Sequence, residues 1–566
     1  MSAALHYIPE AYSIDGPKLM GRNAAGESFI RGYLKHTKPA ETIWVYVDDQ
    51  EHAKAFQLLA KEFGRQEKIS AIDKYSLQST GSASVIFHPG PGIGEQAYLR
   101  RLYGDASWSI CGITHTTSSA RAMDSIVDLI TAPVQPWDAI ICPSEAVKKN
   151  VENILQAQVQ YLRHRLGISR LVQPLFPVIP LGIHTADFKF SDTQRNSSRS
   201  ELGVDQEDLI VLYMGRLSFH AKAHPLSMYQ ALEEAHRKTS RNIVLVECGW
   251  HANDFIKDAF TEAAAVACPS IKRIHLDGRL EKNRILAWSS ADIFCSLSDN
   301  IQETFGIVPL EAMAAGLPVV VSDWDGYRDT VRNGIDGFRI STLAPRPGLK
   351  EDLSHRHALG IDSYDMYCGS SSSFVSVNLT ELIDAFVQLI KSKNLRREMG
   401  EAGKERAKNF YDWRAVIPQY EELWENQAEI RQAFSAGRLK TGSQNTNKSY
   451  TVDQSLVWPA RLDPSASFSH YATRLLDENV SLIFKGGDTQ KSLSLLRTYR
   501  SLKMVNFVDH LLPNDEDVRR ILQKAMDASP SPIYVSQLVA DFDDKEKPLA
   551  IRYLAWLAKL GIFVPV

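Results

Sequence analysis

The chain has 566 residues, of which 44% are apolar and 23% are charged, and its formal net charge is -3. These values exclude a mostly disordered chain and argue against a generally basic nucleic-acid-binding protein, and the length predicts several domains. The sequence contains no apolar run of the roughly 18 residues that a membrane-spanning helix needs, and its six cysteines are widely spaced, with no C-x-x-C pair. We therefore expect a cytoplasmic protein with reduced thiols and no transmembrane segment.

Residues 1–182 alternate between short apolar runs and amphipathic stretches. This alternation is typical of a doubly wound α/β domain with a parallel sheet. Helical periodicity is clearest at 51–63 and 146–166. The predicted strands are residues 4–8, 42–47, 84–87, 109–114, 139–142 and 177–180.

The same pattern restarts and predicts a second α/β domain over residues 183–409. Its predicted strands are 209–214, 243–247, 271–276, 293–296, 318–322 and 337–340, and its helices are 226–239, 254–267, 281–290 and 309–315. Residues 342–378 interrupt this alternation of strands and helices. The segment is longer than a simple connection, so we expect an ordered or lid-like surface insertion. A long helix over 410–432, bent at Pro418, is predicted to return to the first domain and close it.

The remainder of the chain reads as a linker followed by a mainly helical module. Residues 436–454 are polar, and residues 548–560 predict a helix with one buried face, before a terminal strand at 561–566. This order is similar to a winged-helix module over 455–566. Residues 441–566 hold 15 Lys/Arg against 14 Asp/Glu, which argues against nucleic-acid binding and favours subunit or protein contacts. The predicted buried face consists of Leu549, Tyr553, Leu554, Leu557 and Leu560.

Two glutamates, Glu303 and Glu311, are separated by seven residues around a predicted helix start. The free N–H groups at a helix start can bind a diphosphate. A carboxylate accepts several hydrogen bonds at once, so Glu303 could bind sugar hydroxyls and Glu311 the two hydroxyls of a ribose. Alone, this spacing is equally compatible with two solvated glutamates.

Further polar residues follow strand ends, where open α/β sheets bind ligands. Arg216 and Lys222 come after the strand that ends near Gly215, and they could neutralise a diphosphate. The turn Asp277-Gly278-Arg279-Leu280 ends another strand, as a loop beside a nucleotide base would. Surface cations and a plain turn are the alternative readings.

In this order the motifs resemble the donor domain of retaining nucleotide-sugar glycosyltransferases of the GT-B type, similar to glycosyltransferase family 4. The resemblance covers roughly residues 1–430 and is most specific over 205–340. Residues 141–145, 179–184 and 323–331 match further landmarks. It implies two Rossmann-like domains that face each other across a cleft, and hexosyltransferase activity.

The resemblance also implies residue roles. Arg216 and Lys222 bind the donor diphosphate, Glu311 binds the ribose, and Glu303 meets the transferred sugar. His115, at a strand end of the first domain, lies near the anomeric side, although a structural core histidine is the alternative. The expected donor-binding residues are Gly215, Arg216, Lys222, Gly278, Arg279, Leu280, Glu303, Thr304, Phe305, Gly306, Ile307 and Glu311.

Two departures from the family pattern are visible. The turn with Gly21, Arg22 and Gly26 resembles the family's first loop, a weak acceptor or phosphate loop, but it lacks the usual adjacent glycine pair. Six steps, rather than the familiar five, separate Arg216 from Lys222. The extra residue affects the placement of Lys222.

The expected reaction moves a sugar from a UDP- or GDP-linked donor to a hydroxyl of a glycan, lipid-linked or small-molecule acceptor, in polysaccharide or glycoconjugate biosynthesis. Retention implies attack on the same face as the leaving phosphate. No D-x-D motif stands where a metal-dependent donor site needs one, so we expect no metal and no cofactor. The alternatives are a UDP-sugar epimerase or hydrolase, a pyridoxal-phosphate phosphorylase of the same fold, and a non-catalytic nucleotide-sugar or glycan-binding scaffold.

Overall fold

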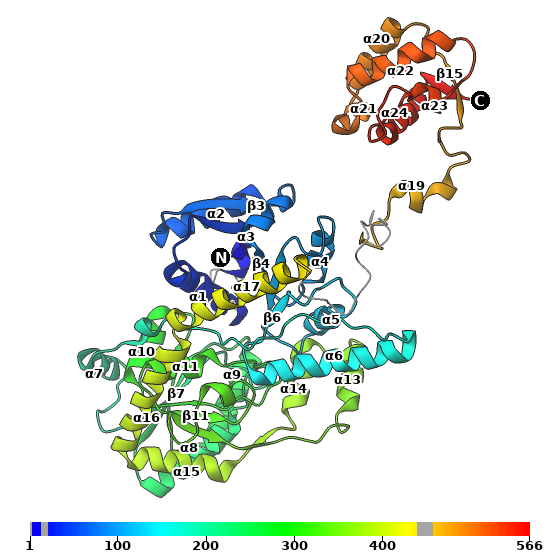
Figure 1. The fold of residues 1–566 in the computed structure, drawn as a ribbon. Helices are drawn as coiled ribbons and strands as arrows, with labels where there is room; N and C mark the ends of the chain where they lie inside the picture. Colours follow the sequence, from blue (N-terminus) through cyan, green and yellow to red (C-terminus); the bar gives the residue numbers. More distant parts are fainter. Residues whose placement is uncertain (1–2, 13–20, 438–456) are drawn as a thin grey trace. The chain divides into compact units, whose positions relative to one another are not determined.

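The computed structural model describes residues 3–12, 21–437 and 457–566, which form two units, Met1–Thr451 and Val452–Val566. The larger unit contains two α/β domains (Figure 1). No helix of the described ranges is both long and apolar enough to cross a membrane. All six cysteines are buried and free.

The first domain is a six-stranded parallel sheet in the order β3-β2-β1-β4-β5-β6. Successive side chains of β1 enter different cores, Ala3 and Leu5 on one face and Ala4 on the other, because strand residues alternate between faces. Helices α1 and α2 pack on the first face, and α4, α5 and α6 on the second. The bounds are β1 Ala3–His6, β2 Thr42–Tyr46, β3 Lys68–Ile72, β4 Val85–Phe87, β5 Ser109–Ile113, β6 Ala139–Ile141, α1 Gly21–His36, α2 Gln50–Glu62, α3 Thr80–Ala83, α4 Gly94–Arg101, α5 Ala120–Asp128 and α6 Glu145–Leu166.

The sixth strand of this sheet is β3, not the predicted strand at 177–180. Residues 177–180 pair with the sheet only through an isolated bridge between Cys142 and Val178. Pro177 and Pro180 have no N–H group to donate to a ladder, which explains why no regular strand forms. The sequence pattern missed β3 because it is an edge strand whose side chains are mostly not buried.

The second domain repeats the arrangement with the order β12-β11-β10-β7-β8-β9, again parallel. Helices α10 and α11 cover one face, and α8, α9 and α15 the other. The doubly wound fold predicted from the sequence is confirmed. The bounds are β7 Leu209–Met214, β8 Ile243–Gly249, β9 Lys272–Asp277, β10 Ile293–Ser296, β11 Val319–Ser322, β12 Gly337–Ile340, α7 Asp192–Glu201, α8 Leu226–Thr239, α9 Asp254–Ala267, α10 Glu281–Ser290, α11 Ile307–Ala314, α12 Tyr327–Thr330, α15 Leu379–Lys391 and α16 Lys393–Arg406.

The insertion at 342–378 folds into a small subdomain. Strands β13 (Thr342–Leu343) and β14 (Ser376–Val377) pair antiparallel at its base, so the chain leaves and returns at one place. Helices α13 (Glu351–Ala358) and α14 (Tyr364–Ser372) pack on each other between the two strands.

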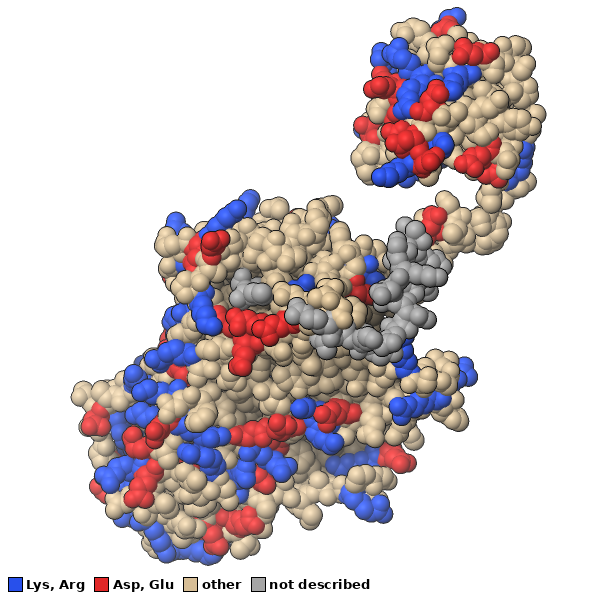
Figure 2. Space-filling model, viewed as in Figure 1, with Lys and Arg blue, Asp and Glu red and all other residues tan. Residues whose placement is uncertain are grey.

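Helix α17 (Trp413–Ser435) carries the chain back to the first domain, where it packs on α1, β4 and β5. It is the yellow helix against the blue domain in Figure 1. The chain crosses between the domains twice, and the two crossings are joined by a bridge between Ile183 and Asp412. Figure 2 shows acidic side chains gathered over α17, whose exposed acidic residues are Glu422, Glu425 and Glu429.

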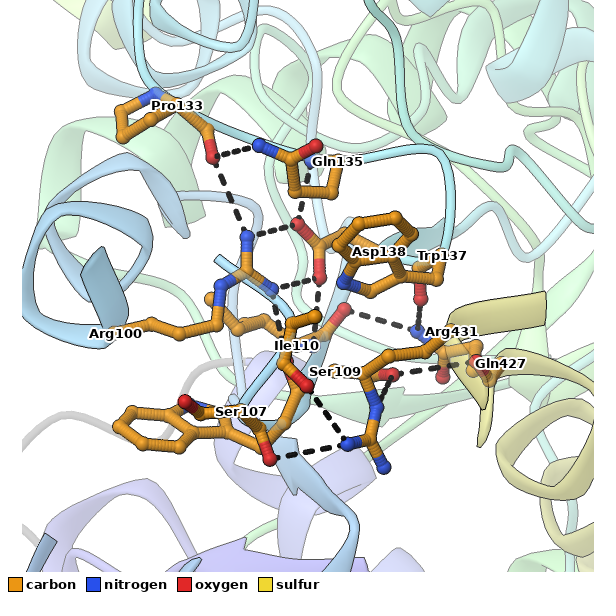
Figure 3. A network of polar contacts seen from close by, with 12 residues as sticks. Arg100, Ser107, Ser109, Ile110, Pro133, Gln135, Trp137, Asp138, Gln427 and Arg431 are labelled. Carbon is orange, nitrogen blue, oxygen red and sulfur yellow. Dashed lines mark hydrogen bonds and ion pairs between the residues drawn. The ribbon is translucent and has the colours of Figure 1, made fainter. Parts of the chain in front are cut away.

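A buried polar network fixes α17 to the first sheet (Figure 3). The Asp138 carboxylate accepts two hydrogen bonds from Arg100, at 2.5 and 2.9 Å, and both side chains are completely buried. From α17, the Gln427 amide donates to the carbonyl oxygens of Ile110 and Trp137 at 3.0 and 2.9 Å. These two carbonyl groups, which α17 buries, thereby have hydrogen-bond partners.

The C-terminal unit has a three-stranded antiparallel sheet in the order β16-β15-β17 with helices around one core. Helix α24 carries the predicted apolar face, with one correction. Leu549 is 39% exposed, and Ala550 takes its place in the core. The predicted linker at 436–454 lies almost entirely outside the described residues. The bounds are β15 Ser481–Phe484, β16 Ile533–Tyr534, β17 Phe563–Pro565, α19 Pro464–Ser467, α20 Thr489–Arg500, α21 Lys503–Asn506, α22 Asp515–Ala528, α23 Val535–Leu538 and α24 Lys547–Lys559.

Candidate functional site

The start of α11 lies at the carboxyl edge of the second sheet. Gly306, its N-cap, has φ +90°, and an added Cβ would lie 2.1 Å from the ring of Tyr327. Only glycine fits there, because the backbone is left-handed and the aromatic ring blocks any side chain. Ile307 and the following residues thus form a helix start, whose first N–H groups have no partner within the helix.

Lys222 and Glu303 form an ion pair beside this helix start. The Glu303 side chain is only 10% exposed. Burial by itself raises the pKa of Glu303, but Lys222 and the N–H groups of Thr304 and Phe305 outweigh it, so the pKa lies below its ordinary value. Glu303 is therefore an ionised carboxylate held in a fixed position, and the extra residue before Lys222 does not prevent the two from meeting.

Arg216 lies on the same side of the site, after the end of β7. Its Nη2 donates to the carbonyl oxygen of Ala221 at 2.8 Å and to the Gln302 side chain at 3.1 Å. Both partners are neutral, so the guanidinium charge remains available to an anion. Gly215, just before it, has φ +142°, a conformation that favours glycine.

The predicted base-side loop is open at the surface. Arg279 is paired with Asp277 at 2.7 Å and is largely exposed, and Leu280 is 57% exposed. Arg284, which the sequence motifs did not single out, donates to the carbonyl oxygens of Gly278 and Arg279 at 3.0 Å and thereby holds this loop.

Burial raises the pKa of Glu311 to about 7, and the charge of Arg284 acts in the opposite direction, so these two side chains lie in one neighbourhood. The base-side loop and the predicted ribose ligand are therefore brought together by a residue on α10 that belongs to neither motif.

Two further carboxyls lie near the site and were not among the predicted site residues, the buried Asp299 and the half-buried Asp325. Burial raises the pKa of Asp299 to about 7. Burial and the charge of Glu303 raise the pKa of Asp325 to about 8. Asp325 also has φ +44°, an uncommon conformation for a residue with a side chain.

These three raised values predict how stability depends on pH. Between roughly pH 4 and pH 8 the folded chain binds more protons at Glu311, Asp299 and Asp325 than the unfolded chain, so the free energy of unfolding falls as pH rises. Buried histidines with a lowered pKa, such as His88 and His184, act in the opposite direction, but a variant without the three carboxyls keeps them. The prediction therefore concerns a difference: from about pH 5.5 to about pH 8.5 the melting temperature of the wild type should fall by roughly 5 °C more than that of such a variant. The triple variant Asp299→Asn, Glu311→Gln, Asp325→Asn should show a much smaller fall. Equal falls in both proteins would contradict this prediction.

His115, after β5, meets the donor-side residues across the cleft. Thr304 donates its hydroxyl to the His115 carbonyl oxygen at 3.0 Å. Ser144, at the start of α6, donates to the Thr304 carbonyl oxygen at 2.8 Å. The two domains are therefore in contact at the residue next to Glu303. Nε2 of the His115 ring lies 3.2 Å from the Pro89 carbonyl oxygen, to which it donates a hydrogen bond when it carries the proton.

A cavity of about 510 Å³ lies in the first domain beside His115. Its wall includes Gly26, but not in a loop: Gly21, Arg22 and Gly26 all lie in helix α1, which corrects the predicted glycine-rich turn. An added Cβ at Gly26 would lie 2.2 Å from the Ala11 carbonyl oxygen. This glycine therefore serves close packing of the helix against the turn before it.

The insertion reaches the same region from the second domain. The Tyr364 hydroxyl on α14 lies 3.2 Å from Thr116 Oγ1 and 3.0 Å from Ser118 Oγ, in the loop after His115. At the other side of α14, Gly369 packs on His220, which belongs to the loop between Arg216 and Lys222. The insertion thus contacts both the donor-side loop and the loop that borders the first-domain cavity.

Removing one hydroxyl tests whether this contact orders the first-domain loop. In Tyr364→Phe, we expect amide hydrogen exchange over residues 115–119 to accelerate by about 2- to 10-fold, since one or two neutral hydrogen bonds are lost. Tyr367→Phe, in the same helix with its ring stacked on His357, is the matched control. Equal exchange in Tyr364→Phe and the wild type would show that the contact does not order the loop.

Residues 194–344, which contain β7 to β12 and the residues around Lys222, Glu303 and Glu311, match the family model described as glycosyl transferases group 1. The resemblance predicted from the sequence is confirmed for this domain. Its motifs are those that the structure places at the start of α11 and the end of β7.

Curated relatives match parts of this chain. A phosphatidyl-myo-inositol mannosyltransferase of Mycobacterium leprae is 31% identical over 160 residues, 28% of this chain and 33% of the relative. A D-inositol 3-phosphate glycosyltransferase of Corynebacterium efficiens is 27% identical over 235 residues, 41% of this chain and 46% of the relative. The chain thus spans a third to a half of the length of these relatives. The crystal structure of Anabaena HepE in complex with UDP is 15% identical, with a TM-score of 0.48, over 75% of this chain and all of HepE.

Proposed function

We propose that this glycosyltransferase domain takes a nucleoside diphosphate sugar, UDP- or GDP-linked, and that the protein transfers its sugar to a hydroxyl acceptor with retention of configuration. The observation that carries this proposal is the Lys222–Glu303 pair at the start of α11. An ammonium, a carboxylate and helix N–H groups together match a diphosphate next to a sugar.

The proposed roles follow from the positions of the side chains. Arg216 and Lys222 face the diphosphate, and charge that develops on the leaving phosphate is met by these cations and the helix start. Glu311, half-buried near the base-side loop, accepts hydrogen bonds from the ribose. Glu303 contacts hydroxyls of the sugar, and His115 borders the sugar from the first domain.

A screen of nucleotide sugars tests the donor. We expect one UDP- or GDP-linked sugar to raise the melting temperature and Glu311→Gln to lose most of that rise. Inositol-containing acceptors are tested first, since both relatives above are named for them, and the anomeric configuration of the product is read by NMR. A product with inverted configuration would contradict retention.

The same experiments test two other functions. A UDP-sugar epimerase or hydrolase of the same fold would convert the donor with no acceptor present, so product analysis separates it from a transferase. A non-catalytic binding scaffold would bind the nucleotide sugar without turnover. Glu303→Gln separates a transferase from a binding scaffold. The substitution should slow transfer while donor binding persists, whereas a scaffold has no transfer to slow.

Metal removal gives a further expected result. We propose a metal-independent reaction without a cofactor, in which side-chain cations and the helix start offset the charge of the diphosphate. Activity in the presence of EDTA should therefore equal activity in its absence to within about twofold. Complete loss with EDTA that Mn²⁺ or Mg²⁺ restores would contradict metal independence.

For the C-terminal unit we propose contacts with a protein partner or a second subunit, and no binding of nucleic acid. The face of this unit in Figure 2 carries both basic and acidic side chains, and mixed charge disfavours phosphate binding. A chain truncated after Ala436 should keep donor binding and lose assembly. Salt-sensitive DNA binding by the full chain that this truncation abolishes would contradict the proposal.

A further inference from the structure

The segment between helices α20 and α22 of the C-terminal unit is apolar and is not buried. Seven of the twelve residues from 501 to 512 are apolar, and none of the twelve is buried. Helix α21 lies within this segment, at an edge of the unit in Figure 1. Met504 and Phe507 are 80% and 73% exposed, and Leu502 and Leu511 are 44% and 48% exposed. We call residues 501–512 the apolar loop.

The core of the C-terminal unit is complete without the apolar loop. Its buried apolar side chains come from the three strands, from helices α20, α22, α23 and α24, and from the turns beside them, and no residue of 501–512 is among them. Single exposed apolar side chains are normal on a protein surface. A contiguous group of large ones instead marks a surface that another molecule covers.

The two ends of the apolar loop are fixed to the folded unit. Arg500 donates a hydrogen bond to the Pro513 carbonyl oxygen and lies over the ring of Trp556. Arg497, one turn earlier, pairs with Asp515 at 2.7 Å. These contacts join the end of α20 to the start of α22, so the loop leaves and returns at one place. A surface held in this way loses less conformational freedom on binding than a free segment would.

Two opposite charges flank the most exposed apolar side chains of the loop. Lys503 comes just before Met504, and Asp509 comes two positions after Phe507. Both charged residues are exposed, and within the described ranges neither of them forms an ion pair. The loop therefore presents one free cation and one free anion on either side of its apolar part.

This arrangement of charges is complementary to itself. In a contact between two identical surfaces around a two-fold axis, residue i of one copy meets residue j of the other, and j meets i. Lys503 of each copy can therefore meet Asp509 of the partner subunit. The exposed apolar side chains then lie between two ion pairs and are removed from water.

We propose that the apolar loop is a homodimer interface, in which it packs against the same loop of a second copy of this chain. Met504 and Phe507 are the apolar anchors, since methionine and aromatic side chains are enriched in the cores of such interfaces. Lys503 and Asp509 fix the register and orientation of the two copies. The proposal rests on the subunit contact proposed above for the C-terminal unit, and it names the surface and the partner of that contact.

The mass of the full chain in solution tests the dimer. In sedimentation at increasing concentration, we expect the wild type to reach twice the chain mass of 63.4 kDa. Phe507→Asp should raise the dimer dissociation constant by about 100-fold or more. Phe255→Asp is the matched control and should leave it unchanged, because Phe255 on α9 of the larger unit is also 73% exposed. A wild type that stays monomeric up to its solubility limit overturns the proposal, since a different partner would then cover the loop.

Charge reversal tests whether the partner is a second copy. In Lys503→Asp alone or Asp509→Lys alone, like charges meet at both ends of the contact, so each variant should dimerise about tenfold more weakly than the wild type. The double variant Lys503→Asp/Asp509→Lys should regain the affinity of the wild type. A mixture of the two single variants should form a 1:1 heterodimer, because opposite charges then meet at both ends. Single variants that dimerise as tightly as the wild type overturn the proposed arrangement.

Truncation distinguishes this interface from the broader subunit contact on which it rests. A chain truncated after Ala436 that still dimerises would refute any subunit contact through the C-terminal unit. Assembly that is lost on truncation but unchanged in Phe507→Asp would refute only the apolar loop as its surface. The substituted side chains are exposed, so each full-length variant should melt within about 2 °C of the wild type, which shows that it is folded. None of these measurements depends on nucleotide-sugar binding.

Discussion

Replacing Lys222 with methionine is expected to slow glycosyl transfer by about 100- to 1,000-fold, the loss seen when one group that stabilises developing charge is removed. Lys222 lies at the site where the proposed leaving phosphate gains charge, and its ion pair with Glu303 fixes its position before the donor binds. Methionine keeps the length of the side chain and removes only the charge. The measurement is the initial rate of nucleotide diphosphate release at saturating donor, together with donor affinity by calorimetry.

Two further variants separate the charge of Lys222 from its effect on Glu303. Without Lys222 the buried Glu303 carboxylate has no cation, so its pKa rises. The double variant Lys222→Met/Glu303→Gln lacks that unpaired charge, and it should be slower than Glu303→Gln alone if Lys222 acts on the phosphate. Lys282→Met is the matched control, since Lys282 also pairs with a glutamate, Glu201, but is exposed. A rate within threefold of the wild type in Lys222→Met would exclude the proposed role.

Replacing Asp138 with alanine should lower the free energy of unfolding by about 3–5 kcal/mol, because it leaves a completely buried guanidinium without its anion. Arg100 cannot lose its proton to escape this cost. Urea denaturation is followed by tryptophan fluorescence, for which Trp137, the residue before Asp138, is a buried reporter.

An exposed pair of the same chemistry provides the control. Asp187→Ala removes the partner of Arg31, whose side chain is 26% exposed, and should cost about 1 kcal/mol or less. In Arg100→Met/Asp138→Leu both charges are replaced by apolar groups, and most of the lost stability should return. A loss below about 1 kcal/mol in Asp138→Ala would show that water reaches Arg100 after the substitution.

The sequence predicted those parts of the fold whose signals are local. Apolar runs such as Leu209–Met214 and Ile293–Ser296 are buried on both faces, so their strands were recognised at their observed bounds. Edge strand β3 lacks this signal, and residues 177–180 carry it without the N–H groups that a ladder needs. Gly26 resembled a loop glycine because close packing of a helix on Ala11 leaves no trace in the neighbouring residues.

Residues of the site were likewise predicted where their sequence signal is local. Short motifs contain the predicted residues around one helix start and one strand end, namely Glu303, Glu311, Arg216 and Lys222. The residues that were missed act through distant partners. Tyr364 contacts Thr116 across 248 positions of the chain.

The bridge between Ile183 and Asp412 restricts how the cleft can open. Ile183 donates to the Tyr411 carbonyl at 2.7 Å and accepts from the Trp413 N–H at 3.1 Å, so the two chain crossings are bound to each other. We expect any opening of the two domains to pivot at this pairing, because sliding or twisting of one domain over the other would break it. Such opening would separate the Thr304 hydroxyl from the His115 carbonyl and the Ser144 hydroxyl from the Thr304 carbonyl while the pairing stays intact.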